Sequence, residues 1–135
     1  MMYSFLRANL NAEAFLMLFY VGAGISHFLF KDFLVEIMPP QIPMKELVVY
    51  ATGLLEILLG AALLKAELRA KAAWLIIIML TSYLWVHVYM LLEQTKFIEM
   101  FMLDKYTADP SIFFSMRIFL QFVMIYWIYA FTQES

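Results

Sequence analysis

The sequence predicts an all-α membrane protein: an antiparallel bundle of four transmembrane helices, with short interfacial helices in the loops on the outer side. The 135 residues are 65% hydrophobic and 15% charged, and their mean hydropathy of +0.83 does not suit a soluble domain. Four apolar stretches each approach the ~20 residues that a helix needs to cross the hydrocarbon core. Because they take up most of the chain, we expect one transmembrane domain over residues 1–135.

The first two spans are expected at about residues 12–30 and 47–64, on either side of a proline-rich connection. Glu13 and His27 interrupt the first stretch, which therefore suits a permanent span better than a cleavable signal peptide. Apolar residues of the connection recur at helical spacing, which predicts a short interfacial helix. This helix should end before Pro39, because proline restricts the preceding residue and supplies no amide donor.

The third and fourth spans are expected at about residues 72–92 and 112–131. The segment KAELRAK, residues 65–71, is so short that the second and third spans must be antiparallel neighbours. Beyond the third span the helical spacing of apolar residues continues and predicts a second interfacial helix. Asp109 suits the N-cap of the fourth span, and Pro110 suits its first helical position.

The distribution of Lys and Arg predicts the orientation of the chain. Four of these residues lie in the N-terminal segment and KAELRAK, and four others are spread over the two longer loops. Although these totals are equal, the higher density favours KAELRAK and both termini in the cytoplasm, by the positive-inside rule. We expect a multi-pass protein of the inner or plasma membrane, with its two longer loops outside.

Composition also limits the partners and the chemistry. The net charge is −2 and no basic cluster beyond KAELRAK occurs, so a nucleic acid is excluded as a partner. The chain has no cysteine, so any redox chemistry must come from a bound cofactor or a partner. The expected partners are the lipid bilayer and either another membrane protein or a second copy of the chain. Without a nucleophile motif or phosphate loop, a membrane subunit or binding protein is favoured over a stand-alone enzyme, and no catalytic residue is assigned.

The most informative residue is Glu56, near the middle of the second span. An ionisable side chain at this depth costs at least ~2.5 kcal/mol and is normally paired and functional. At a rise of ~1.5 Å per residue, Glu56 and Gln121 lie ~14 Å below the outer interface. On the same scale His27, His87 and Arg117 lie ~5 to 8 Å deep. We therefore expect these five residues to form a polar, ligand-binding cluster, in which Arg117 reaches down to pair with Glu56.

Structural interpretations of the same residues stay open. Arg117 is close enough to the interface to extend toward the outer headgroups without a partner. Each histidine could be a hydrogen-bonded packing residue, and Glu56 could be a purely structural carboxylate, paired or kept neutral by burial. The two histidines and Glu56 belong to three different spans and lack sequence-local ligand spacing, so no metal site is predicted.

Glycines are placed to let the spans approach each other closely. Gly24 shares a helical face of the first span with Tyr20 and His27. Gly53 and Gly60 precede and follow Glu56 by three and four residues, on one face of the second span. We expect these three glycines to pack against neighbouring helices.

Motifs in all four spans resemble the DoxX-like family of small four-helix membrane proteins. The most specific are the His-Phe pair followed by the proline loop and the G-x-x-E-I-x-x-G pattern of the second span. The matching segments are GISHF at 24–28, IMPPQIP at 37–43, LVVYATGLLEILLGAALL at 47–64, RAKAAW at 69–74 and RIFLQF at 117–122.

This resemblance implies a four-helix bundle whose polar positions would be His27, Glu56, Arg117 and Gln121. Some members of the family are linked to thiosulfate:quinone oxidoreductase as a membrane subunit. Distant similarity extends to MauE-type redox-associated proteins and to assembly chaperones of acetylcholine receptors. The redox-associated branch often carries cysteines and this chain has none, which argues against a thiol role of its own.

Three functions are therefore considered. The leading hypothesis is a component of a membrane redox system that binds a quinone or another lipid-soluble ligand near Glu56 and Arg117. The alternative is a non-enzymatic accessory or assembly subunit of a larger membrane complex, in which the polar cluster holds the bundle together. A proton-coupled carrier could use the same Glu56, but the chain lacks the broken helices and repeats typical of carriers.

Overall fold

The computed structural model describes residues 12–98, 100–101 and 110–133, which fold into helices and short turns without a strand. This confirms the predicted all-α class. The elements are α2 (Ala12–Leu29), α3 (Lys31–Ile37), α4 (Lys45–Ala62), α5 (Ala66–Leu92), α6 (Gln94–Phe97), α7 (Pro110–Tyr129) and the 3-10 helix η1 (Ala130–Gln133).

Three helices are long and apolar enough to cross a membrane: α2, α5, and α7 continued through η1 to Gln133. They correspond to the first, third and fourth predicted spans. The second, α4, also has 18 residues, but it is not among these three helices. It carries Lys45 and Glu46 in its first turn and Glu56 in its middle, and these charges lower its hydropathy. Its role as a fourth span therefore stays a prediction.

The connection between α4 and α5 is shorter than the sequence indicated. KAELRAK was expected to be a loop, but α5 begins at Ala66, so only Lys65 of this segment lies outside the helix. Ala, Glu, Leu, Arg and Lys all favour helix, and no glycine or proline interrupts them. Hydropathy marks where a helix enters lipid, not where the helix begins. With 27 residues, α5 extends ~40 Å, so its charged first turns project beyond a hydrocarbon core of ~30 Å.

The predicted interfacial helices are both present, with different lengths. α3 has seven residues and ends at Ile37, before the prolines as expected. α6 has only four residues and buries Phe97. α7 begins at Pro110 as predicted, whereas its proposed N-cap, Asp109, lies outside the described residues.

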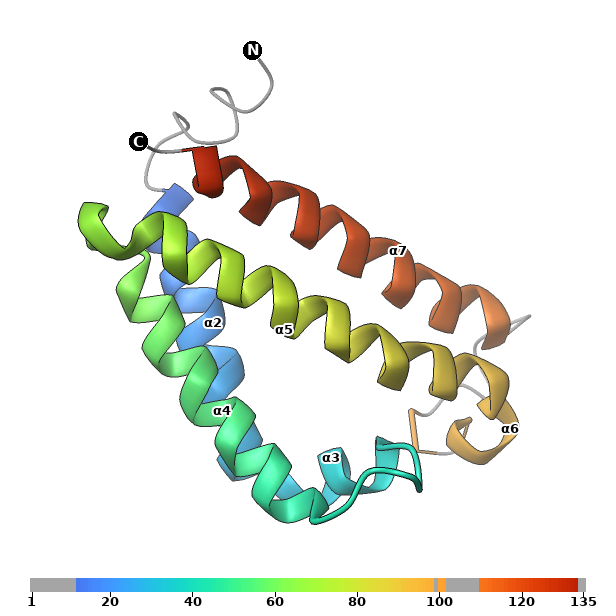
Figure 1. Ribbon diagram of the computed structural model, residues 1–135. Helices are drawn as coiled ribbons and strands as arrows, with labels where there is room; N and C mark the ends of the chain where they lie inside the picture. Colours follow the sequence, from blue (N-terminus) through green and yellow to red (C-terminus); the bar gives the residue numbers. More distant parts are fainter. Residues whose placement is uncertain (1–11, 99, 102–109, 134–135) are drawn as a thin grey trace.

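The long helices are arranged as two pairs (Figure 1). α2 packs along α4, and α5 packs along α7, whereas the contact between α4 and α5 is smaller. The two pairs meet near the α4–α5 turn and diverge toward the opposite end, where α3 and α6 lie. The start of α2 and the 3-10 helix η1 lie at the same end as the α4–α5 turn. This placement agrees with the up-and-down order expected of the chain.

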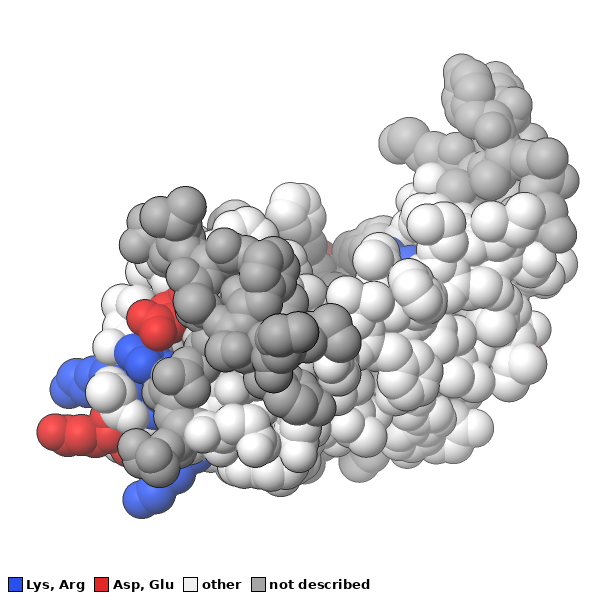
Figure 2. Space-filling view, turned by 90° about the horizontal axis from the view of Figure 1, so that it is seen from above, with Lys and Arg blue, Asp and Glu red and all other residues white. Residues whose placement is uncertain are grey.

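Charged side chains lie at both ends of the molecule, for example Glu13 and Arg69 near the α4–α5 turn and Lys31, Asp32 and Glu46 near α3. In the view of Figure 2, Lys, Arg, Asp and Glu gather at the end that holds the α4–α5 turn, while most of the remaining visible surface is uncharged. This end contains Arg69, whose Nε donates to the Leu63 carbonyl at 2.7 Å and whose Nη1 lies 3.2 Å from Glu13 Oε1. Arg69 therefore ties the end of α4 to the start of α2, as expected of a solvated helix end.

The core consists of two apolar clusters, and the polar residues lie between them along the helices. One cluster is near the α4–α5 turn and the other is near α3 and α6. The first includes the buried side chains of Leu16, Leu63, Ile76, Ile128 and Phe131. The second includes Ile37, Met90, Phe97 and Phe114.

Candidate functional site

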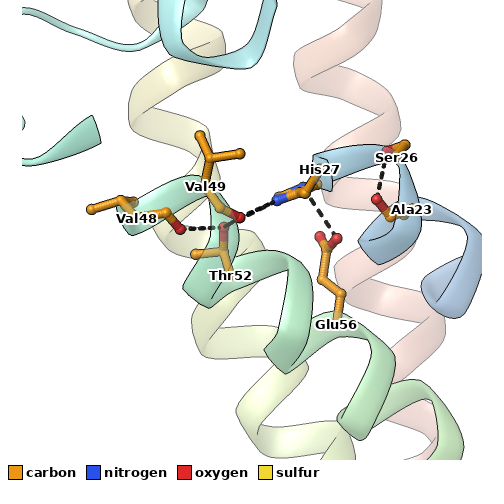
Figure 3. Close-up of polar contacts among 7 residues, drawn as sticks. All are labelled: Ala23, Ser26, His27, Val48, Val49, Thr52 and Glu56. Atoms are coloured by element: carbon orange, nitrogen blue, oxygen red, sulfur yellow. Dashed lines mark hydrogen bonds and ion pairs between the residues drawn. The ribbon is translucent and has the colours of Figure 1, made fainter. Parts of the chain in front are cut away.

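His27 and Glu56 are in direct contact between α2 and α4 (Figure 3). His27 lies in the last turn of α2 and Glu56 in the middle of α4, and their Nε2 and Oε2 atoms are 3.2 Å apart. Only 4% of Glu56 is exposed. The pair joins the two helices that pack most extensively against each other.

Glycines bring His27 this close to α4. A Cβ on Gly24 would collide with the carbonyl oxygen of Gly53 and would lie 2.7 Å from Ile57 Cγ1. A Cβ on Gly53 would lie 2.6 Å from His27 Cβ, and the same atom on Gly60 would lie 3.0 Å from Tyr20 Cβ. The three predicted glycines therefore all lie where α2 and α4 approach each other, with space only for hydrogen.

The surroundings of His27 determine which nitrogen carries a proton. Nδ1 lies 2.9 Å from the Val49 carbonyl oxygen, which can only accept, so Nδ1 must donate. Thr52 Oγ1 is 3.1 Å from the same nitrogen (Figure 3). Because this hydroxyl donates its own proton to the Val48 carbonyl at 2.7 Å, it is a second acceptor for Nδ1. In the neutral imidazole, Nε2 would then have no proton to offer Glu56.

A further proton on His27 or Glu56 would make their contact favourable. An unprotonated Nε2 facing a carboxylate oxygen at 3.2 Å would place two acceptors together. The contact is favourable when the imidazole is protonated as an imidazolium, or when Glu56 is a carboxylic acid that donates to Nε2. In both cases the pair holds one proton that it can pass to a third group.

Two buried tyrosine hydroxyls lie next to this pair. One has no hydrogen-bond partner among the described residues, and the other lies close enough to Glu56 and Thr52 to interact with both. These hydroxyls belong to Tyr20 on α2 and Tyr83 on α5, respectively. The ring of Tyr83 lies 6.5 Å from that of His27, and both hydroxyls interact electrostatically with Glu56. A buried hydroxyl without a partner costs ~1 to 3 kcal/mol, so a ligand atom that bonds to the Tyr20 hydroxyl would be favourable.

The two tyrosines are not among the five residues of the predicted cluster, although their positions along the spans place them at the same depth. Tyr83 is nine residues before Leu92, and Glu56 is nine residues after Leu47, so both lie at the same depth. Tyr20, ten residues before Phe30, lies in the same layer. Only ionisable and amide side chains were counted, and tyrosines were assigned to packing.

Arg117 does not pair with Glu56, which corrects the expected contact. No ion pair joins these two residues, both of which the structure describes. The guanidinium carbon instead lies 5.3 Å from the ring centroid of Phe101 and 5.9 Å from that of Phe113. The reason is the arrangement of the helices: α7 packs on α5, not on α4.

His87 lies on α5 within electrostatic reach of Arg117. Its Nδ1 and the Nε of Arg117 are both buried, and neither has a hydrogen-bond partner in the described part of the chain. These two residues form a second polar group, between α5 and α7, that is separate from the His27–Glu56 pair.

Gln121 also lies on the α5–α7 side. Its Nε2 donates to the backbone carbonyl of Leu80 at 2.7 Å. The predicted cluster of five residues is therefore divided into one pair between α2 and α4 and three residues between α5 and α7.

We expect Gln121→Met to destabilise the protein by ~0.5 to 1.5 kcal/mol, because it removes one hydrogen bond between α5 and α7 without creating a cavity. Unfolding in mixed detergent micelles, followed by circular dichroism, measures this change. Gln41→Met, at an exposed position in the turn before α4, is the matched control and should have no effect. Equal stability of both variants would show that the bond contributes nothing.

Metal coordination finds no support in the described residues. No group of three or more His, Cys, Asp or Glu side chains there is arranged to hold a metal ion. The available chemistry consists of an imidazole in contact with a carboxyl group, two tyrosine hydroxyls and a second polar group of imidazole and guanidinium.

Three helices able to cross a membrane, with ionisable side chains buried between them, indicate an integral membrane protein of the helical class. A family model described as "Domain of unknown function (DUF8561)" matches residues 16–132, and the chain belongs to this family. The matched range contains every residue of both polar groups. No curated protein and no solved structure matches the chain.

Proposed function

We propose that this protein binds the head group of a quinone, or of a similar lipid-soluble ligand, as a component of a membrane redox system. The site would lie between the α2–α4 and α5–α7 pairs. The observation that carries the proposal is the 3.2 Å contact between His27 Nε2 and Glu56 Oε2, next to the buried hydroxyls of Tyr20 and Tyr83.

These residues fit a quinone head group. When bound, a quinone supplies carbonyl oxygens that accept hydrogen bonds and that take up protons when an external donor reduces the ring. Tyr20 and Tyr83 would donate hydrogen bonds to such an oxygen. The His27–Glu56 pair would deliver a proton and later regain one, while Thr52 and the Val49 carbonyl keep Nδ1 protonated and the ring oriented.

The membrane arrangement belongs to the same proposal. α4 would cross the membrane in addition to α2, α5 and α7. One face of α4 packs closely on α2, so the two helices would lie in the same environment. Both termini and the charged α4–α5 turn would face the cytoplasm. The motifs shared with the DoxX-like proteins support this arrangement and the link to quinone chemistry.

Native mass spectrometry of the protein, extracted gently from its own membrane, tests the proposal. We expect a bound mass that matches a quinone, and at least a severalfold loss of this species in Glu56→Gln. A glutamine amide can still donate to His27 Nε2, so this variant should fold while lacking the transferable proton. Glu67→Gln, an exposed position in the first turn of α5, is the control and should retain the ligand. Parent protein without quinone, or equal retention in both variants, would contradict the proposal.

A second candidate is an accessory subunit that binds another membrane protein through α7. Only Phe114 and Ile128 of this helix are buried, and large apolar side chains such as Met116, Phe119 and Phe122 are exposed. In a membrane this face contacts either lipid or another helix. The same spectrum would distinguish the two functions, since a ligand-free protein attached to a larger polypeptide would favour the accessory role.

A further inference from the structure

A cavity of about 450 Å³ lies at the end of the molecule opposite the α4–α5 turn. Residues of α3, the start of α4, the end of α5 and α6 contribute to its wall. This volume is sufficient for a polar head group and the first few carbons attached to it. The wall combines apolar side chains, among them Val35, Met38 and Phe97, with the charged side chains of Glu36, Lys45 and Lys96.

Both lysines have unused hydrogen-bonding capacity. Lys45 Nζ donates to the Met38 carbonyl at 3.2 Å, and Lys96 Nζ donates to the Tyr89 hydroxyl at 3.2 Å. An ammonium group has three donors, so each lysine keeps two. Within the described part of the chain neither lysine has a carboxylate within ion-pair distance. Two cations and one carboxylate, that of Glu36, therefore line the cavity, which leaves its wall with a net positive charge.

The location of the cavity suits a phospholipid. Lys45 is the first residue of α4 and Lys96 belongs to α6, so the two lysines come from different helices, both at the end where the helix pairs diverge (Figure 1). This end of the spans, where the long apolar helices stop, corresponds to the headgroup region of a bilayer. The two lysine ammonium groups could bind an anionic group, and the apolar side chains beside them could contact the hydrocarbon attached to that group.

We propose that this cavity binds one membrane phospholipid, with its phosphate between Lys45 and Lys96. The apolar wall would take the glycerol group and the first methylenes of the acyl chains. Because Lys45 begins α4 and Lys96 lies in α6, which contacts α5 and α7, the phosphate would also connect the α2–α4 pair to the other pair through α6. The site lies apart from the His27–Glu56 pair, so this proposal does not depend on the ligand proposed there.

The test is native mass spectrometry of the detergent-solubilised full chain, titrated with dioleoylphosphatidylglycerol. We expect one tightly bound lipid, and binding about tenfold weaker in Lys45→Ala/Lys96→Ala, since each lost ammonium removes a charge-assisted hydrogen bond. Lys65→Ala/Lys71→Ala removes two lysines at the opposite end and should bind as the parent does. Dioleoylglycerol has the same chains without the phosphate and should bind as weakly as phosphatidylglycerol binds to the double variant.

A substitution that is expected to strengthen lipid binding distinguishes loss of the site from misfolding of the lysine variant. Glu36 lines the same cavity without an ion pair to any described residue, and Glu36→Gln should strengthen phosphatidylglycerol binding by a few-fold because it removes a negative charge near the phosphate. Equal binding of dioleoylglycerol, or unchanged binding in the Lys45→Ala/Lys96→Ala and Glu36→Gln proteins, would overturn the proposal. Displacement of the lipid by millimolar inorganic phosphate would also overturn it, in favour of a soluble phosphate.

Discussion

His27→Leu is expected to destabilise the protein by roughly 1 to 3 kcal/mol, because it leaves the buried carboxyl group of Glu56 without its partner. Glu56 is 4% exposed, and the described residues offer it no cation in place of His27. The same substitution removes the hydrogen bond to the Val49 carbonyl. The free energy of unfolding in mixed micelles measures the total loss.

A double-mutant cycle with Glu56→Met separates the pair from the other contacts of His27. The double variant should recover much of the stability lost in His27→Leu, since no unpaired buried carboxyl group then remains. His87→Leu is the matched control: this imidazole is also half-buried, but its Nδ1 has no described partner, so the loss should be far smaller. Additive effects of His27→Leu and Glu56→Met, or equal losses at His27 and His87, would show that the pair does not stabilise the fold.

The difference between the expected and the observed partner of Glu56 shows what hydropathy and depth can predict. Counting residues along each span places Glu56 and Arg117 within reach of each other, and it places His27 at a depth similar to that of Arg117. Depth does not tell which helices are neighbours. The small residues Gly24 and Gly53 indicate the neighbouring helices, because helix faces without side chains can approach each other closely. Matching these faces would have predicted the α2–α4 pair and, with it, His27 as the partner.

Helix positions were predictable because a long apolar run has few alternatives to a helix in lipid. The start of α5 could not be predicted from hydropathy. Residues Ala66 to Lys71 are too polar for the hydrocarbon core, but they still favour a helix. The cavity near Lys45 and Lys96 could not be predicted either, because it depends on how far the helix pairs diverge. Sequence patterns describe each helix alone, while the divergence results from packing among all of them.

The second large effect is expected at the α2–α4 contact. Gly24→Ala should destabilise the protein by ~1 to 3 kcal/mol, because the added methyl collides with the Gly53 carbonyl oxygen, a backbone atom that cannot rotate away. Alanine favours helix over glycine by ~0.5 to 1 kcal/mol, so the measured loss is what remains after this gain. Gly53→Ala should behave alike, and it should also displace His27, whose Cβ would be 2.6 Å from the new methyl.

Gly22→Ala provides the matched control within the same helix. An added Cβ there meets nothing within 4 Å, so this variant should show only the helix gain and be as stable as the parent or slightly more stable. Thermal unfolding of the three variants in one detergent measures their stabilities. The difference between Gly22→Ala and the other two variants gives the cost of the steric collision without the gain in helix propensity. If Gly24→Ala were as stable as Gly22→Ala, α2 and α4 could separate at little cost. The close contact would then not be what holds His27 against Glu56.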